Sequence, residues 1–401
     1  MKPFGALISF QEAKMVIDRH IKPIDRVESV LLDEAVNRVL VDDFIATMDI
    51  PGFNRAAMDG YAVKSKDTFN AGQFKPKLLK TTGSLHAGEK PEGRILSGQC
   101  YQISTGAMMP PGADAVMMVE DTEREKDTVK VFKAIVPGAN VGKQGEDIKA
   151  GTVVLKAGTF LDAGKIGVLA SHGLTKIQVY QKPKVAVLPT GEEVVAAGKK
   201  LNPGQLYDIN SHTITALVKD NGGVAVNIGI SGDTREALRA AIKEALNNDI
   251  IVLSGGSSVG ERDLLVDVIE GWGEMFFHGV QVKPGKPTIF AVVDGKPIMG
   301  MPGYPTSCLI NSYLFLMPAL RKMAHLSQRR GDKIEAKLSR RVPGSTGRRQ
   351  FLTVKIVDGE AVPVFKESGA ITSIANADGY IEIPENIDLL EKGAPVTVVL
   401  F

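Results

Sequence analysis

The feature that most constrains the fold is a strand-length apolar segment followed by a loop with almost no side-chain bulk. Residues 250–253 are all apolar, and residues 255–260 are three glycines, two serines and a valine. From Leu264 onward, apolar residues recur at helical spacing. In a strand–glycine loop–helix unit, backbone N–H groups at the start of the helix point at an anion that glycine allows to approach. The sequence therefore predicts an anion-binding loop. Its candidate binding residues are Gly255, Gly256, Ser257, Ser258 and Gly260.

Charged residues near this loop indicate what kind of ligand it takes. Asp263 would repel a bare phosphate, so we expect a bound cation beside it. Lys283 and Lys286 belong to the segment V-K-P-G-K-P, where proline and glycine restrict the backbone and hold both ammonium groups in place. A further strand, residues 297–301, leads into another tight loop. The candidate binding residues of that loop are Pro302, Gly303, Pro305 and Ser307. Together these groups indicate an anionic substrate handled with a metal ion.

Strands and helices alternate between residues 184 and 328. Residues 185–188 and 250–253 are apolar strand segments, and residues 238–246 have the spacing of an amphipathic helix. Repeated strand–helix units predict an α/β fold, a doubly wound parallel sheet with helices on both faces. Loops that follow the strands then meet at the carboxyl edge, where ligands of such sheets bind. We therefore expect Glu193, Asp233 and Asp263 to lie at one rim as catalytic, metal-binding carboxylates.

The rest of the chain has shorter elements. Residues 70–135 and the segments 351–357, 361–365 and 396–400 have the composition of β structure, which predicts an inserted β-rich domain and a small C-terminal barrel. Two local signals are specific. Ser9 and Glu12 form a capping box before an apolar stripe, and Asp294-Gly295 is typical of a two-residue hairpin turn.

Composition excludes several classes of protein. The chain of 401 residues is long for one core, and its 48 basic residues nearly balance its 46 acidic ones. No global field then favours nucleic acid or an anionic membrane. Cys100 and Cys308 are far apart in the sequence and indicate neither a zinc site nor a disulfide framework. With no apolar signal region and no long apolar stretch, we expect a soluble cytoplasmic protein.

Four further candidates stand in loops rich in small residues. Asp59 precedes a glycine and a strand, Thr105 follows a strand, and Asp147 follows Gly145 by two positions. Each could be an ordinary turn residue or a site residue. Ser373 belongs to the polar segment 368–379, which could be a plain loop or a lid.

One alternative function has its own motif. Residues 256–260 satisfy G-x-S-x-G between a strand and a helix, the context of a hydrolase nucleophile at Ser258. Small residues chosen for close backbone approach explain the neighbouring Gly255 and Asp263 better, so a serine hydrolase is the weaker hypothesis.

Seven motifs occur in the order found in one known family. They are A-M-D-G-Y-A-V (57–63), T-G-A (105–107), G-E-D-I (145–148), P-T-G-E-E (189–193), S-G-G-S-S-V-G (254–260), K-P-G-K-P (283–287) and P-G-Y-P (302–305). In this the chain resembles the molybdopterin molybdenumtransferases, the family of MoeA and the E domain of gephyrin. The resemblance covers essentially the whole chain.

The resemblance implies a domain plan and a homodimer. An elongated, discontinuous N-terminal dimerisation domain would comprise residues 1–48 and 140–182, with an inserted β-rich domain at 49–139. A molybdopterin-binding α/β domain would comprise residues 183–328, and a C-terminal β-barrel residues 329–401. Asp59, Thr105 and Asp147 would line the cleft from the partner subunit.

The resemblance also implies a reaction. The family consumes adenylylated molybdopterin and molybdate with Mg²⁺, and gives molybdenum cofactor and AMP. Glu193, Asp233 and Asp263 would be the magnesium ligands, and the upstream molybdopterin adenylyltransferase would be a partner. A gephyrin-like scaffold without turnover is the alternative from the same family.

Two positions depart from the usual pattern. Tyr304 replaces the asparagine of P-G-N-P, and Gly279 stands where a basic residue is common. Molybdate and tungstate share charge and shape, so a few closely placed donors must distinguish them. We therefore expect this chain to accept tungstate as well as molybdate.

Overall fold

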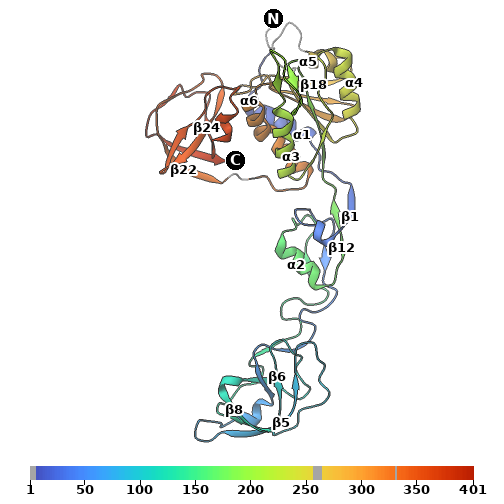
Figure 1. Ribbon diagram of the computed structural model, residues 1–401, viewed down its shortest axis with the longest axis vertical. Coiled ribbons are helices and arrows are strands. Elements are labelled where there is room, and N and C mark those ends of the chain that lie inside the picture. The colour runs from blue at the N-terminus through green and yellow to red at the C-terminus, as the bar shows by residue number, and fades with distance from the viewer. Residues whose placement is uncertain (1–5, 256–263, 330–331) are drawn as a thin grey trace. The chain divides into compact units, whose positions relative to one another are not determined.

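The computed structural model describes residues 6–255, 264–329 and 332–401, in two compact units (Figure 1). The first unit comprises Met1–Ser29, Asn37–Val39 and Gln178–Phe401. The second comprises Val30–Val36 and Leu40–Ile177. Strand β1 (Val27–Leu31) leads from the first unit into the second, and β12 (Lys176–Tyr180), which pairs with it, leads back.

A six-stranded sheet forms the centre of the first unit. Its order is β16 (Val224–Asn227), β13 (Lys184–Pro189), β17 (Ile250–Ser254), β21 (Lys296–Met301), β20 (Ile289–Val293) and β18 (Gly273–His278). The first four strands are parallel, and β20 and β18 are antiparallel to their neighbours. Asp294 and Gly295 both have positive φ in the β20–β21 turn, which confirms the predicted hairpin.

Helices cover both faces of this sheet because successive strand residues point to opposite sides. Val185 and Val187 pack with one group of helices, and Ala186 and Leu188 with another. The first group is α1 (Phe10–His20), α3 (Asn210–Asp220), α6 (Pro305–Asn311), a π-helical turn (Ser312–Leu316) and α7 (Met317–Met323). The second group is α4 (Arg235–Ala245) and α5 (Leu264–Ile269). The doubly wound α/β fold is confirmed.

A second sheet of the first unit is closed. Its strands are β19 (Val282–Lys283), β24 (Arg349–Val357), β25 (Glu360–Pro363), β22 (Lys333–Leu338), β28 (Pro395–Leu400) and β26 (Gly379–Ile383). Because β26 also pairs with β24, the last five form a barrel, as predicted. Short elements beside it are β23 (Val342–Pro343), β27 (Leu389–Leu390) and α8 (Thr372–Ala375). Strand β19 lies between β18 and β20 in the chain and pairs with the barrel strand β24.

The second unit is mainly β structure. Its largest sheet has the order β7 (Ala115–Met118), β4 (Gly60–Val63), β6 (Gln99–Ile103), β5 (Lys77–Leu85), β9 (Thr128–Val131) and β8 (Thr122–Glu125). Two-stranded pairs join β2 (Phe44–Ile45) to β11 (Val153–Leu155) and β3 (Arg55–Ala56) to β10 (Val141–Gly142). The helical pieces are α2 (Ala163–Ser171), Leu32–Glu34, Ser65–Thr68 and Val119–Asp121. The exact four-domain boundaries stay a prediction.

Candidate functional site

The carboxyl rim of the central sheet brings four loops side by side. Because the strand order is β16-β13-β17-β21, the loops carrying Asp233, Glu193, Gly255 and Gly303 follow one another along this edge. Backbone hydrogen bonds join adjacent loops. The Thr190 amide donates to the Ser254 carbonyl at 2.9 Å, and the Gly255 amide donates to the Met301 carbonyl at 3.2 Å.

Two of the predicted carboxylates lie on adjoining loops of the rim. Asp233 is exposed, and its Oδ2 accepts from the Glu192 amide at 3.2 Å. The Glu193 side chain is also exposed and lies over the backbone of Gly191, where a Cβ would be only 2.8 Å from its Oε2. These are hard oxygen donors of the kind that magnesium prefers. Within the described residues, no three His, Cys, Asp or Glu side chains gather tightly enough to hold a metal ion by themselves.

Glycine residues lie on the two loops that follow β17 and β21, next to the loops that carry the acids. Gly255 has φ of +94°, and a Cβ there would stand 2.5 Å from the Thr190 carbonyl oxygen. A Cβ on Gly303 would be 3.6 Å from the Gly255 Cα. Packing of the adjacent loops therefore requires glycine at position 255, and the predicted binding of an anion by this loop stays a prediction. The remaining loop candidates lie outside the described residues: Gly256, Ser257, Ser258, Gly260 and Asp263.

The turn that carries Lys283 and Lys286 is fixed by a residue that sequence reasoning missed. Asn311, fully buried at the last position of α6, donates from Nδ2 to the carbonyl oxygens of Pro284 and Gly285, both at 3.4 Å. It also donates to the Ser307 carbonyl at 2.8 Å. Both lysines are half-buried. The signal available in the sequence was an asparagine directly after the apolar run Cys308–Ile310.

The loop after β21 is held from two sides. On one side, the buried Asn210 at the start of α3 donates from Nδ2 to the Gly303 carbonyl at 2.8 Å. On the other side, Thr306 binds the segment that follows the barrel strand β25. Its amide donates to the Ser368 carbonyl at 3.0 Å, and its Oγ1 donates to the Ala370 carbonyl at 2.8 Å. The segment considered as a loop or a lid is thus bonded to the rim.

Several predicted binding residues of this region are buried. Ser373 is fully buried, and its Oγ accepts from the Lys366 amide at 3.0 Å. Ser307 and Pro302 are buried as well, and Pro305 is half-buried at the first turn of α6. In contrast, Tyr304 at the N-cap position of α6 is 67% exposed.

The second unit brings two of its three candidates together. Asp59 Oδ1 accepts from the Thr105 amide at 2.6 Å and from its Oγ1 at 2.9 Å. These hydrogen bonds lower the pKa of Asp59, the backbone bond most, because both stabilise the charged carboxylate. Asp147 is exposed on a separate loop, where its amide donates to the Ile50 carbonyl at 3.1 Å. That these residues line a partner subunit's cleft stays a prediction.

Comparison with known proteins identifies the family. Residues 8–173 match the MoeA N-terminal region (domain I and II), residues 186–322 a molybdopterin binding domain, and residues 335–401 the MoeA C-terminal region (domain IV). A molybdopterin molybdenumtransferase of Staphylococcus epidermidis is 33% identical, over 98% of this chain and 95% of that protein. A molybdopterin biosynthesis protein of Methanocaldococcus jannaschii is 36% identical over the full length of both.

The chain belongs to the MoeA family of molybdopterin molybdenumtransferases. A crystal structure of a MoeA protein from Pyrococcus horikosii superposes with a TM-score of 0.86 at 41% identity, covering 98% of this chain and 99% of that one. The family places the protein in molybdenum cofactor biosynthesis, as a transferase, and confirms the resemblance. Membership also sets aside the serine hydrolase hypothesis, whose Ser258 lies outside the described residues. No helix in the described part of the chain is long and apolar enough to cross a membrane.

An open pocket lies between segments that come from the same loops as the two rim acids and the start of α3. It has a volume of about 480 Å³, and its walls come from the segments that leave Glu193 and lead to Asp233. Strand β14 (Val194–Val195) pairs in parallel with β15 (Leu206–Tyr207), and lining residues follow both strands, Ala196 after β14 and Asp208 after β15. Its lining residues are Ala196, Ala197, Lys199, Asp208, Ser211, His212, Asn227, Gly229 and Ile230. No sequence pattern indicated this pocket.

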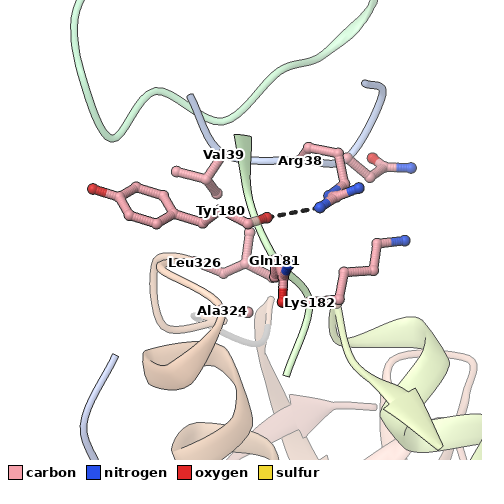
Figure 2. Close-up of a pocket in the computed structure, with 9 residues that line it drawn as sticks. Arg38, Val39, Tyr180, Gln181, Lys182, Ala324 and Leu326 are labelled. Carbon is pink, nitrogen blue, oxygen red and sulfur yellow. Dashed lines mark hydrogen bonds between the residues drawn. The ribbon is translucent and has the colours of Figure 1, made fainter. Parts of the chain in front are cut away.

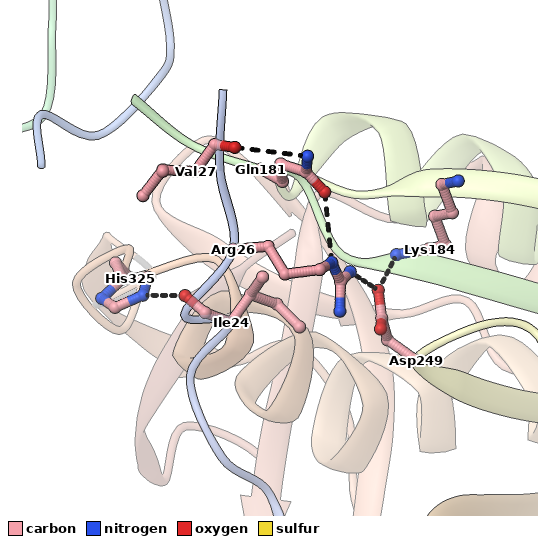
Figure 3. A network of polar contacts seen from close by, with 7 residues as sticks. All are labelled: Ile24, Arg26, Val27, Gln181, Lys184, Asp249 and His325. Carbon is pink, nitrogen blue, oxygen red and sulfur yellow. Dashed lines mark hydrogen bonds and ion pairs between the residues drawn. The ribbon is translucent and has the colours of Figure 1, made fainter. Parts of the chain in front are cut away.

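A second pocket and a polar network have a structural role. The pocket beside Arg38, Tyr180 and Leu326 has room for about 10 Å³ (Figure 2), too little for a substrate. In the network of Figure 3, Arg26 pairs with Asp249 at 2.7 Å, and the Asp249 carboxylate also accepts from the Lys184 amide at 2.8 Å. Lys184 and Asp249 stand at the amino ends of β13 and β17, the edge of the sheet opposite the carboxyl rim.

Proposed function

We propose that this chain catalyses the Mg²⁺-dependent insertion of molybdate or tungstate into adenylylated molybdopterin, with release of AMP. The observation that carries the proposal is the order of groups along one sheet edge: carboxylates on the β16 and β13 loops, glycine backbone after β17, and a lysine turn fixed to α6. A substrate with a phosphoanhydride and an oxyanion needs these groups.

The carboxylates would hold the metal ion. Glu193 and Asp233 are exposed on adjoining loops, and Asp263, outside the described residues, is proposed as the third ligand. When bound, Mg²⁺ would polarise the phosphoanhydride and neutralise charge on the leaving AMP. The pocket of about 480 Å³, lined in part by residues 196–199 and 227–230 of the same two loops, would have room for the nucleotide part of the substrate.

The lysines would bind the oxyanion. Asn311 holds the backbone of the turn at Pro284 and Gly285, so the Lys283 and Lys286 side chains start from fixed positions. Fixed cations stabilise an anion without the cost of reorganising at the moment of reaction. Ser307 and Ser373 are both buried, and they would hold the backbone around the oxyanion site in place.

The second unit would act in a homodimer. Asp59 is held as a carboxylate by Thr105, and Asp147 is exposed on a separate loop of the same unit. We propose that these three residues complete the cleft of the partner subunit. The substrate is an adenylylated compound, so an adenylyltransferase must supply it, and we propose that enzyme as a partner.

The test is a complete reaction with purified protein, adenylylated molybdopterin, Mg²⁺ and molybdate. We expect release of AMP together with cofactor formation, and a loss of at least a hundredfold in rate for Glu193→Gln, since the metal would lose a ligand. Glu236→Gln, which changes an exposed carboxylate in the first turn of α4, is the control and should react like the wild type. Wild-type protein that releases no AMP and forms no cofactor would refute the proposal and favour a scaffold.

A further inference from the structure

An aromatic ring stands exposed on the rim, and local structure does not explain it. Tyr304 is 67% exposed and occupies the N-cap position of α6, yet its side chain makes no capping hydrogen bond. The asparagine usual in the related motif is a good helix cap, whereas tyrosine is not. The chain therefore carries a solvated aromatic surface in place of a stabilising cap.

One edge of the ring lies beside a glycine. A Cβ on Gly369 would lie 3.5 Å from Tyr304 Cδ1 and 3.8 Å from Cε1, so one edge of the ring adjoins a residue without a side chain. Gly303 precedes the tyrosine and approaches Gly255. Thr306 fixes the segment of Gly369 by hydrogen bonds to Ser368 and Ala370. A planar ligand above the glycines would meet the Tyr304 ring without obstruction from neighbouring side chains.

The order of groups along the rim indicates which planar ligand this is, given the proposed function. Adenylylated molybdopterin has two flat heterocycles, a pterin and an adenine, joined through a phosphoanhydride. The metal-binding acids follow β16 and β13, while Tyr304 follows β21, with β17 between them. The lysine turn for the oxyanion is bonded to Asn311 at the other end of α6, the helix that Tyr304 precedes. The molybdenum or tungsten of the oxyanion is inserted at the sulfur atoms of the pterin part. The pterin therefore belongs on the β21 side, near the lysine turn, and the adenine belongs beyond the magnesium-binding acids.

We propose that Tyr304 is a stacking platform for the pterin ring and a specificity-determining residue of this chain. The inference rests on the proposed function, because that function supplies the two heterocycles. Stacking of a flat heterocycle on an aromatic side chain contributes enough to change affinity about tenfold when the ring is removed.

The test uses 6-hydroxymethylpterin as the probe and its fluorescence as the signal. Tyr304→Phe keeps the ring and should bind like the wild type. Tyr304→Leu keeps apolar area without a π face, and Tyr304→Asn restores the usual residue; both should bind about tenfold more weakly. AMP, titrated separately, should bind all four proteins equally. Because Tyr304 is largely exposed, the variants should keep the wild-type fluorescence of Trp272 as evidence of folding.

Three results would overturn the inference. One is that the wild type does not bind the pterin, and another is that the Leu and Asn variants bind it as well as the wild type. The third is that these variants lose affinity for AMP instead, which would assign the ring to the adenine. Turnover separates this inference from the proposed reaction. Pterin binding that depends on Tyr304 without AMP release refutes the reaction alone, and turnover with an unchanged KM in Tyr304→Asn refutes the stacking alone.

Discussion

Gly285→Ala should destabilise the first unit far more than an ordinary glycine substitution. Gly285 has φ of +97°, and an alanine Cβ there would overlap the Asn311 amide nitrogen, with the Asn311 Cγ at 2.8 Å and Oδ1 at 3.3 Å. Asn311 is fully buried, so it cannot turn out into solvent without disturbing its neighbours. The new methyl group would therefore displace a side chain that holds Pro284, Gly285 and Ser307.

The expected magnitude has two parts. An alanine at positive φ costs about 1 kcal/mol. Displacing Asn311 removes the partners of its own buried amide and its bond to the Pro284 carbonyl, at about 1–3 kcal/mol for such groups, whereas the Gly285 carbonyl keeps the hydrogen bond from Thr288 Oγ1. We expect a loss of about 2–4 kcal/mol in the free energy of unfolding. Gly204→Ala is the matched control, because Gly204 has φ of +86° and nothing lies within 4 Å of its added Cβ. It should cost about 1 kcal/mol.

Trp272, the single tryptophan of the chain, provides the assay. Its indole donates to Asp294 Oδ2 at 3.1 Å, and the Arg239 guanidinium lies 4.7 Å from its ring centre, so its fluorescence reports on the central sheet. Urea unfolding followed at Trp272 gives the difference in free energy between variants. In an Asn311→Ala background, the cost of Gly285→Ala should fall to that of the control. Equal costs for Gly285→Ala and Gly204→Ala in the wild-type background would refute the reasoning.

Three more outcomes are expected. Thr105→Val removes one of the two donors to Asp59 and should raise the pKa of that carboxyl, which NMR titration measures. Because the pKa of Asp59 is lowered in the folded protein, its contribution to folding stability is present above the ordinary carboxyl pKa and is lost as pH falls through the lowered value. An unchanged pKa in the variant would contradict the assigned cause. Insertion rates with molybdate and tungstate at matched concentrations should differ by less than about tenfold, or about 1.4 kcal/mol. A strong molybdate preference that persists in Tyr304→Asn would show that this position does not set the choice. Light scattering at micromolar concentration should give a dimer, and a fully active monomer would contradict the shared cleft.

Local sequence signals determined individual elements. Ser9 and Glu12 form the expected capping box, with hydrogen bonds of 3.3 Å and 3.0 Å, because the two partners are three residues apart and need no distant help. Alternating apolar strands and amphipathic helices determined a parallel sheet, since an apolar strand must be covered on both faces. The rule that loops meet at the carboxyl edge then placed Glu193 and Asp233 on one rim.

Tertiary structure decided which neighbours these groups have. The strand order puts Asp233 beside Glu193 and separates both from Tyr304 by β17, and no local pattern encodes that order. The lysine turn depends on Asn311, which is 26 residues from Gly285 in the sequence. The segment of Ser368 is bonded to Thr306, and β26 closes the barrel on β24, because packing brings distant backbone groups into hydrogen-bonding distance. Sequence patterns act over a few residues, whereas these contacts form only after the chain has folded back on itself.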